Sequence, residues 1–283
     1  MTVLVATPES VLVQATFAYS LLARRLLQFL AMSHTFLTAR HALFLDFDGT
    51  LVNIAPRPHD VRVDPVLLEH LRALQSALKG ALAIVTGRAL ADVDHFLAPL
   101  QLPVAGEHGA QFRWEDGSTQ GVEALPLDDV VNHLRPLLIR HPALLLEKKR
   151  TGLALHFRQA PQLEAVCFRV LADATACIPG AELIGGKCVF EIKSANASKG
   201  RAIEAFMGRH PFADRIPLFI GDDVTDEPGF AAVQARGGMG IKVGEGATQA
   251  RARLSSPAAV AAWLALGVEP LTPNAAVADQ EKN

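Results

Sequence analysis

Short apolar runs alternate with amphipathic stretches over most of the chain. Three of these runs have the composition of β-strands, lie at 42–47, 81–85 and 218–220, and are each followed by a glycine-bearing turn and a helical pattern. Strands that are apolar throughout and alternate with helices are typical of a parallel sheet covered on both faces. The pattern therefore predicts an α/β fold whose ligands lie beyond the carboxyl ends of these strands.

The middle of the chain has a different pattern. The ranges 127–140 and 162–177 have helical amphipathic spacing, and Pro136 predicts a break or bend in the first. The ranges 144–150 and 153–158 can pair as a hairpin, and the second of them alternates apolar with polar residues as a strand does. We expect a small antiparallel sheet that has one charged face and is backed by two helices.

This change of pattern predicts an inserted domain. We expect an α+β cap at 111–193, which would include a further alternating strand at 187–193. The catalytic core would then consist of 40–110 and 194–268. A cap of this length is within the usual size of a small domain.

The two ends of the chain lie outside these domains. The N-terminal extension, 1–39, contains an apolar helical stretch that Arg24 and Arg25 interrupt; it is too short to span a bilayer and lacks the features of a secretory signal. Two interpretations stay open: the extension is a packed or frayed helix, or translation begins at Met32. The tail, 269–283, is small, polar and charged, and we expect it to be mobile.

The charge balance argues against broad electrostatic binding. The chain has 27 Lys and Arg against 29 Asp and Glu, so it offers no basic field for a nucleic acid or an anionic membrane. We expect a cytoplasmic monomer that binds a small anionic molecule at a local basic site. The three cysteines, Cys167, Cys177 and Cys188, lack metal-ligand spacing, and we expect them to be reduced and structural.

Two carboxylates follow the first predicted strand. Asp46 and Asp48 lie in the run Asp46-Phe47-Asp48-Gly49-Thr50 and can both face one cleft. Such a pair can cleave a phosphate ester, because Asp46 can attack phosphorus while Asp48 protonates the leaving alkoxide and later takes a proton from water. An isolated acidic turn closed by glycine is more often a solvated turn. The assignment therefore depends on the residues that accompany it.

A phosphoryl group that faces an aspartate needs positive charge nearby. Asp222 and Asp223 follow the third predicted strand, and oxygen-only ligation with a phosphate substrate favours Mg²⁺. We expect the carboxylates of Asp46 and Asp222 and the backbone carbonyl of Asp48 to bind the metal. Asp223 and Asp226 are expected to support these ligands, and Asp226 also to cap the following helix.

Two further segments can bind phosphate. Thr86-Gly87-Arg88 follows the second predicted strand and opens a helix, so a hydroxyl and backbone amides can receive phosphate oxygens. Lys199 begins another helical pattern and can supply positive charge. Taken singly, each has an ordinary explanation, as a strand-to-helix turn and as a solvated lysine.

Together, these segments resemble the four ordered motifs of the haloacid dehalogenase superfamily, at Asp46 to Thr50, Thr86, Lys199 and Gly221-Asp222-Asp223. The resemblance implies a Rossmann-like core, Mg²⁺ and an aspartyl-phosphate mechanism. It also implies that Thr50 orients the general acid. Thr86 and Lys199 would bind the transferring phosphoryl group, and Lys199 would also hold Asp46.

The charged face of the predicted cap indicates a ligand with many hydroxyls, because mixed carboxylates and amines can grip both donors and acceptors. A merely solvent-exposed face is the more common explanation for such a sheet. The candidate substrate-binding residues are Glu107, His108, Glu147, Lys149, His156, Arg158, Lys187 and Glu191. Glu107 and His108 can serve either the substrate or the hinge, and His108 can be a proton shuttle or a histidine satisfied by backbone.

Several runs around the cap resemble trehalose-6-phosphate phosphatases: Leu146-Glu147-Lys148-Lys149, His156-Phe157-Arg158, Gly106-Glu107-His108-Gly109, 186–193 and 221–227. The resemblance covers about 42–266 and implies hydrolysis of trehalose 6-phosphate to trehalose and phosphate. It also implies that Glu147, Lys149 and Glu191 contact the disaccharide. Phe157 stands where this family often has tyrosine, and Thr86 where many members have serine.

Three other functions remain open. A phosphatase for another sugar phosphate, such as sucrose 6-phosphate, would differ only in its cap residues. A phosphomannomutase-like isomerase would share the cap and the aspartyl phosphate but would need a bisphosphate activator and release no phosphate. A non-catalytic sensor of sugar phosphates is disfavoured, because Asp46, Asp48, Lys199 and Asp222 are all retained.

Overall fold

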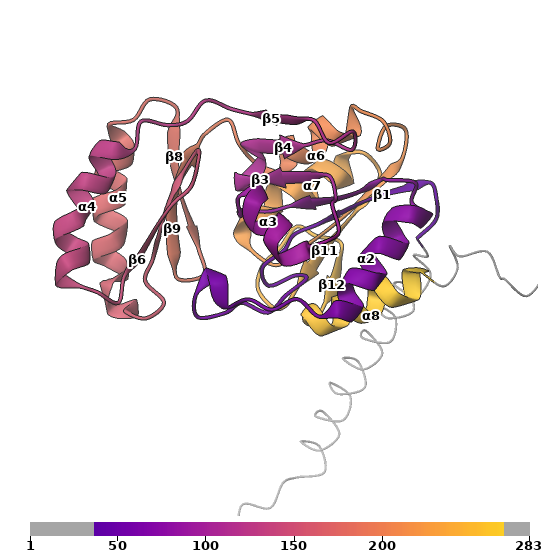
Figure 1. Ribbon diagram of the computed structural model, residues 1–283, viewed down its shortest axis with the longest axis horizontal. Helices are drawn as coiled ribbons and strands as arrows, with labels where there is room; N and C mark the ends of the chain where they lie inside the picture. Colours follow the sequence, from indigo (N-terminus) through magenta and orange to yellow (C-terminus); the bar gives the residue numbers. More distant parts are fainter. Residues whose placement is uncertain (1–36, 269–283) are drawn as a thin grey trace, which may run out of the picture. The chain divides into compact units, whose positions relative to one another are not determined.

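The computed structural model describes residues 37–268 of the chain (Figure 1). Most of the predicted N-terminal extension and the whole predicted tail at 269–283 therefore lie outside the described residues. No helix within the described range is long and apolar enough to cross a membrane.

A large sheet forms the centre of the core. Its strands are β1 (His41–Leu45), β2 (Leu82–Val85), β3 (Val104–Gly106), β4 (Gln111–Arg113), β5 (Thr119–Gly121), β10 (Ile216–Gly221), β11 (Met239–Val243) and β12 (Ala252–Leu254). They are arranged in the order β12-β11-β10-β1-β2-β3-β4-β5. The strands from β12 to β3 are parallel, β4 runs antiparallel to β3, and β5 runs antiparallel to β4. The three predicted strands are confirmed as β1, β2 and β10, which are neighbours at the centre.

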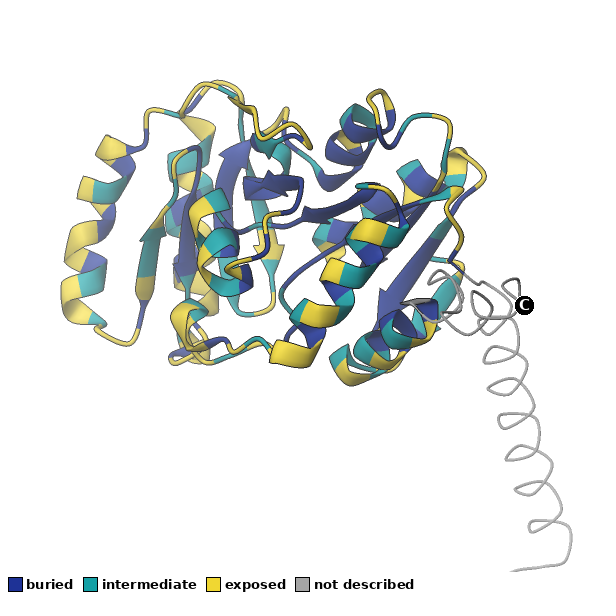
Figure 2. Cartoon of the chain, turned by 45° about the vertical axis from the view of Figure 1, so that its right-hand side comes forward, coloured by how far each residue is buried: buried dark blue, intermediate teal, exposed yellow. Residues whose placement is uncertain are grey.

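Helices cover this sheet: α2 (Pro65–Ala77), α3 (Leu90–Leu97), α6 (Lys199–Met207), α7 (Glu227–Ala235) and α8 (Pro257–Val268). Helix α6 packs beside α7, and α2 packs beside α8. Aromatic rings fill the layer between sheet and helices, since Phe44 of β1 meets Phe206 of α6 with ring centroids 5.9 Å apart. Helix α2, for example, buries Leu67, Leu71 and Leu74 against the core and exposes polar residues on its other side (Figure 2). The predicted α/β fold is confirmed.

A second sheet has four antiparallel strands: β6 (Leu145–Lys148), β7 (Leu153–His156), β8 (Ala181–Gly186) and β9 (Val189–Ser194), in the order β6-β7-β9-β8. Helices α4 (Asp128–Arg140) and α5 (Glu164–Ala176) lie side by side against it (Figure 1). The short turn η3 (Pro161–Leu163) leads into α5. We call the segment from α4 to β9 the cap. Its predicted hairpin and two helices are confirmed.

Helix α4 contradicts one of the two alternatives predicted at Pro136, a break, while the other, a bend, stays a prediction. It runs through Pro136 without the expected break. Pro136 lies on the exposed side of the helix, so the carbonyl that loses its hydrogen-bond donor can bind water instead. A proline at such a position need not end a helix whose opposite side is anchored by buried residues such as Leu134.

The start of the cap also differs from the sequence-based boundary. The residues from 111 to 121, which were expected in the cap, include β4 and β5 at the edge of the large sheet. Val104 pairs with Arg113, so β4 folds back antiparallel on β3 and extends the core. The division into a core and an inserted cap stays a proposal, with cap elements running from Asp128 to Ser194.

Candidate active site

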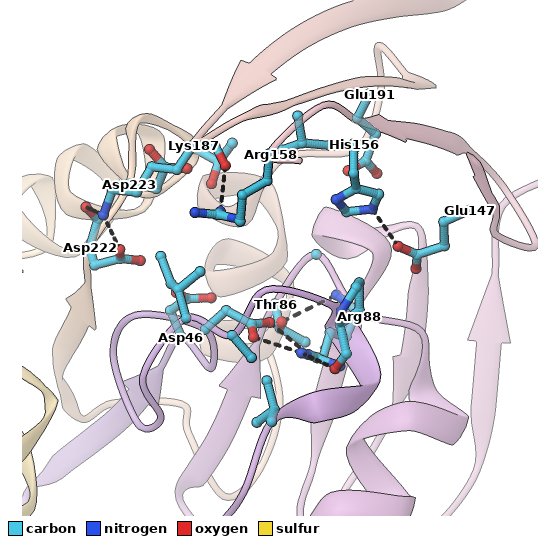
Figure 3. Close-up of a pocket in the computed structure, with 18 of the residues that line it drawn as sticks. Asp46, Thr86, Arg88, Glu147, His156, Arg158, Lys187, Glu191, Asp222 and Asp223 are labelled. Atoms are coloured by element: carbon cyan, nitrogen blue, oxygen red, sulfur yellow. Dashed lines mark hydrogen bonds and ion pairs between the residues drawn. The ribbon is translucent and has the colours of Figure 1, made fainter. Parts of the chain in front are cut away.

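The carboxyl ends of the central parallel strands meet at a pocket between the core and the cap (Figure 3). Asp46 follows β1, Thr86 follows β2, and Asp222 follows β10. Parallel strands place such residues at one edge of the sheet. The pocket is also lined by Asp48, Gly87, Arg88, His108, Glu147, Lys149, His156, Arg158, Lys187, Glu191, Lys199 and Asp223.

Asp46 is held by a buried lysine. Lys199, which is 3% exposed, donates from Nζ to Asp46 Oδ1 at 2.6 Å and to Asp226 Oδ1 at 2.6 Å. The hydroxyl of Thr50 donates to Asp46 Oδ2 at 3.3 Å, and not to Asp48, the general acid that it was expected to orient. Lys199 is the first residue of α6, and Ser198 caps that helix by accepting a hydrogen bond from the amide of Arg201. Ser198 thus fixes where α6 begins, and so it fixes the position of Lys199.

The electrostatics of this group are dominated by burial and by excess negative charge. Burial and the neighbouring Asp226 raise the pKa of Asp46 well above its usual value, and Lys199 opposes this rise. Burial alone would lower the pKa of Lys199, but Asp226 and Asp46 raise it instead. The lysine is therefore charged, and its positive charge is shared between two carboxylates.

Asp46, Asp222 and Asp226 form an acidic group whose carboxylate oxygens lie within 4.8 Å of one another. The oxygens of Asp226 are already engaged, since Oδ1 accepts from Lys199 and Oδ2 accepts from the backbone amides of Asp222 and Asp223 at 2.8 Å. Asp46 and Asp222 are the members that line the pocket. This oxygen-rich donor set fits Mg²⁺, with Asp226 supporting the two others.

Asp226 plays only part of its predicted helix-capping role. Its side chain makes no capping bond at α7, but with Asp223 it forms a capping box at the start of the turn η4 (Val224–Asp226). Its carboxylate turns back to the amides at the end of β10, because it is completely buried there beside Lys199. Asp223 forms the other half of this capping box, and its side chain also accepts from the amide of Val224. Gly221 lets the Asp226 side chain approach the end of β10, because a Cβ at position 221 would lie 2.3 Å from the carboxylate carbon of Asp226.

Asp222 is placed by residues from both sides of the pocket. Lys187, at the turn between β8 and β9, bonds to the Asp222 carboxylate, and the buried Lys242 of β11 bonds to its backbone carbonyl. Burial raises the pKa of Asp222, and Lys187 opposes this rise. Gly49, at φ +77°, closes against the same carboxylate, and a Cβ there would lie 2.1 Å from Asp222 Oδ2. Lys242 was not predicted from the sequence.

The side chain of Asp48 lies apart from this acidic group. Its two oxygens accept hydrogen bonds from Arg88 Nε at 2.6 Å and from Arg88 Nη2 at 2.7 Å. Thr86, in the same turn, is buried, and its hydroxyl accepts from the amide of Arg88. The predicted role of the Asp48 backbone carbonyl as a metal ligand stays a proposal.

The cap supplies a linked set of charged side chains (Figure 3). Lys149 pairs with Glu191 at 2.7 Å and donates to the carbonyl of Gly87 at 2.9 Å, so a cap residue reaches the turn that follows β2. His108 Nε2 lies 3.4 Å from Glu191 Oε2. Burial would raise the pKa of Glu191, but Lys149 and His108 lower it to about 2. Burial lowers the pKa of His108, which favours its neutral form.

A second group continues the charged face. His156 Nε2 lies 2.9 Å from Glu147 Oε2, and Arg158 donates to the carbonyl of Lys187 at 2.7 Å. Burial would raise the pKa of Glu147, but the hydrogen bond from His156 lowers it. The predicted charged face of the cap sheet is thus turned toward Asp46 and Asp222 (Figure 3).

Comparison with known proteins identifies the family. The family model for trehalose-phosphatase matches residues 44–258, which is most of the chain. The chain belongs to the trehalose-phosphatase family. It is therefore a phosphoric monoester hydrolase, as predicted from the strand-end motifs.

Individual relatives agree with this assignment. Trehalose-6-phosphate phosphatase of Escherichia coli K12 is 44% identical over 231 residues, which cover 81% of this chain and 86% of that protein. The crystal structure of a trehalose-6-phosphate phosphatase related protein has 27% identity and a TM-score of 0.66, covering 81% of this chain and 97% of the other. A phosphatase of the haloalkanoate (HAD) enzyme superfamily from Bacteroides thetaiotaomicron has 18% identity and a TM-score of 0.57, over 83% and 96% of the two chains. The last likeness concerns the fold alone and supports the predicted HAD-like core.

Among the predicted substrate-binding residues, all of which the structure describes, Glu107 alone is not part of the pocket lining. Its carboxylate lies outside the pocket lining and accepts from Gln111 Nε2, from the amides of Arg150 and Thr151, and from the Thr151 hydroxyl. Arg150 and Thr151 lie in the β6–β7 turn of the cap, whereas Gln111 belongs to β4 of the large sheet. Of its two predicted roles, the geometry favours the hinge over the substrate.

Glu107 and His108 adopt positive φ angles of 46° and 59°, which are unusual for residues other than glycine. Backbone bonds hold them there, because the Glu107 amide donates to the carbonyl of Arg88 and the His108 amide donates to that of Thr86. The ring of His108 then packs on Gly87, where a Cβ would lie 2.8 Å from it. The turn that contains Thr86 and Arg88 and the segment that contains Glu107 and His108 are therefore one connected unit.

Proposed function

We propose that this chain hydrolyses trehalose 6-phosphate to trehalose and phosphate, with Mg²⁺ and through an aspartyl phosphate formed on Asp46. The observation that carries the proposal is the position of the Asp46–Lys199 pair directly opposite the charged face of the cap. Its relative from Escherichia coli, named trehalose-6-phosphate phosphatase, supports the choice of substrate.

In the first half-reaction, a carboxylate oxygen of Asp46 attacks phosphorus, and the bond from phosphorus to the sugar oxygen breaks. Asp48 gives its proton to that oxygen, so trehalose leaves as a neutral alcohol. In the second half-reaction, Asp48 takes a proton from water as the water oxygen attacks phosphorus. The bond to Asp46 then breaks, which releases phosphate and restores both carboxyl groups.

Positive charge and hydrogen-bond donors are needed around the phosphoryl oxygens. Lys199, the hydroxyl of Thr86 and the amide of Gly87 are the groups of this chain that would bind them. Thr50 would keep Asp46 aligned for attack. Mg²⁺, held by Asp46, Asp222 and the Asp48 carbonyl, would neutralise the charge of the phosphoryl group.

A phosphate-release screen tests this function. We expect phosphate from trehalose 6-phosphate in the presence of Mg²⁺, with release lost after chelation and restored by added Mg²⁺. Sucrose 6-phosphate and mannose phosphates are the comparison substrates. A clear preference for either, or formation of an isomer without phosphate release, would replace the proposal by the corresponding rival function.

The cap contributes specificity if it binds the sugar. We predict that Glu191→Ala lowers kcat/KM for trehalose 6-phosphate by about 10²-fold, because removing one buried charged hydrogen-bond partner costs roughly 2–3 kcal/mol. The loss for 4-nitrophenyl phosphate should be several-fold smaller, since this ester has no disaccharide to bind. Steady-state kinetics on both esters measures the difference.

Glu164→Ala is the matched control, because Glu164 is an exposed glutamate of the cap on the first turn of α5. It should leave both substrates unaffected. Equal losses on the two esters in the Glu191 variant would show that the residue acts on folding or on the phosphoryl site rather than on the sugar.

A further inference from the structure

Arg88 is a pocket residue to which the predicted mechanism gives no role. Its side chain is 9% exposed, and its planar guanidinium binds both oxygens of Asp48, through Nε at 2.6 Å and Nη2 at 2.7 Å. Two parallel hydrogen bonds of this kind fix the orientation of a carboxylate as well as its position. Asp48 needs such a partner, because its side chain is 36% exposed and follows a strand end.

The arginine is itself held from three directions. Its guanidinium carbon lies 5.3 Å from the ring centre of Phe47 and 4.8 Å from that of Phe96. Nη2 also donates to the carbonyl of Pro58 at 3.0 Å, in the turn η1 (Pro58–Asp60) that borders the pocket. These contacts leave the guanidinium little freedom, so it can act as a fixed support.

Arg88 also belongs to the turn that binds phosphate. Its amide donates to the hydroxyl of Thr86 at 3.2 Å, and its carbonyl accepts from the amide of Glu107 at 2.8 Å. The residue that would grip the phosphoryl group and the residue that holds Asp48 are therefore two positions apart in one rigid turn. Movement of the turn would shift both together.

We propose that Arg88 is a positioning residue, which holds the Asp48 carboxyl at the correct place relative to the phosphoryl group for proton transfer. The proposal rests on the proposed function, in which Asp48 gives a proton to the sugar oxygen and later receives one from water. The carboxylate that Asp48 becomes between these steps is the form that both Arg88 donors bind. Arg88 thus keeps the group in place between the two half-reactions.

The test uses two leaving groups. A sugar alkoxide needs a proton to leave, whereas 4-nitrophenolate leaves without one, so a misplaced acid slows the first far more than the second. For Arg88→Gln we expect the first-turnover release of trehalose, measured by rapid quench, to fall about 10²-fold, and the release of 4-nitrophenolate to fall at least about tenfold less. Arg88→Lys keeps the positive charge over the rings but cannot donate two parallel hydrogen bonds to Asp48. It should therefore also slow the release of trehalose more than that of 4-nitrophenolate.

A double variant separates positioning from direct binding. If Arg88 acts through Asp48, Arg88→Gln in an Asp48→Asn background should cause little additional loss. Two results would overturn the proposal and make Arg88 a phosphoryl ligand. One is a double variant in which the losses of the two single variants multiply; the other is an equal loss on both esters together with weaker inhibition by inorganic phosphate. If Arg88→Gln does not fold by circular dichroism, Arg88→Lys provides the same comparison.

Arg57→Gln is the matched control, because Arg57 is an exposed arginine on the same pocket wall. Any change in the release of trehalose in this variant should equal the change in the release of 4-nitrophenolate. Failure of the unchanged enzyme to hydrolyse trehalose 6-phosphate would refute the proposed function. Normal turnover by that enzyme with balanced losses in both Arg88 variants would refute only the role of Arg88.

Discussion

Asp46→Asn is expected to reduce phosphate release from trehalose 6-phosphate by on the order of 10⁴-fold or more, because the amide cannot act as the nucleophile. Asparagine has nearly the same size and shape as aspartate, so the packing around position 46 is retained. Asparagine can still accept from Lys199 through its oxygen. We expect the thermal unfolding temperature to stay close to that of the unchanged protein or to rise, since one buried negative charge is removed beside Asp222 and Asp226.

The control for this variant is Asp60→Asn, an exposed aspartate of the turn η1. It should retain full activity under the same phosphate-release assay. If Asp46→Asn keeps turnover within tenfold of the unchanged enzyme after deamidation has been excluded by mass spectrometry, another group must attack phosphorus.

Lys199→Met is expected to affect both activity and stability. The variant removes the cation between two buried carboxylates, Asp46 and Asp226, while keeping a side chain of similar length. Removing one partner of a buried ion pair costs about 3–5 kcal/mol, because the remaining charges are left uncompensated. Phosphate release should also fall by several orders of magnitude, since the phosphoryl group loses the positive charge that Lys199 would supply.

The pH dependence of this contribution has a defined sign. Because the pKa of Lys199 is raised in the folded state, its stabilising charge is fully present at neutral pH and is lost only as the solution becomes strongly alkaline. Denaturant unfolding at pH 7 therefore reports the full loss in Lys199→Met. Lys148→Met, which removes an exposed cap lysine paired with Asp128, should leave the free energy of unfolding almost unchanged. Similar losses in the two variants would contradict the proposed importance of the buried network.

The parts of the site that could be predicted are those fixed by local sequence and by strand order. Apolar runs identified β1, β2 and β10, and the parallel arrangement then brings Asp46, Thr86 and Asp222 to one edge of the sheet. Lys199 begins a helix in the structure as its pattern indicated, and it bonds to Asp46. The chemical roles of these residues remain predictions until they are tested.

The parts that could not be predicted depend on contacts between distant segments. Arg88 reaches Asp48 across 40 positions of sequence, and nothing in the local pattern selects that partner. Lys242 lies between apolar residues in β11, so its bond to the carbonyl of Asp222 depends on the neighbouring strand β10. Glu107 occupies a positive-φ conformation that its residue type does not signal, which is why its bonds to the cap hairpin were missed.

The central claim is that Asp46 becomes phosphorylated during hydrolysis of trehalose 6-phosphate. The most direct measurement is acid quenching during turnover of trehalose 6-phosphate labelled at phosphorus, followed by digestion and identification of the labelled peptide. We predict one hydroxylamine-sensitive acyl phosphate, on the peptide containing Asp46, and no label in Asp46→Asn. Label on another residue, or full turnover with no labelled protein at quench times shorter than one turnover, would contradict the proposed mechanism.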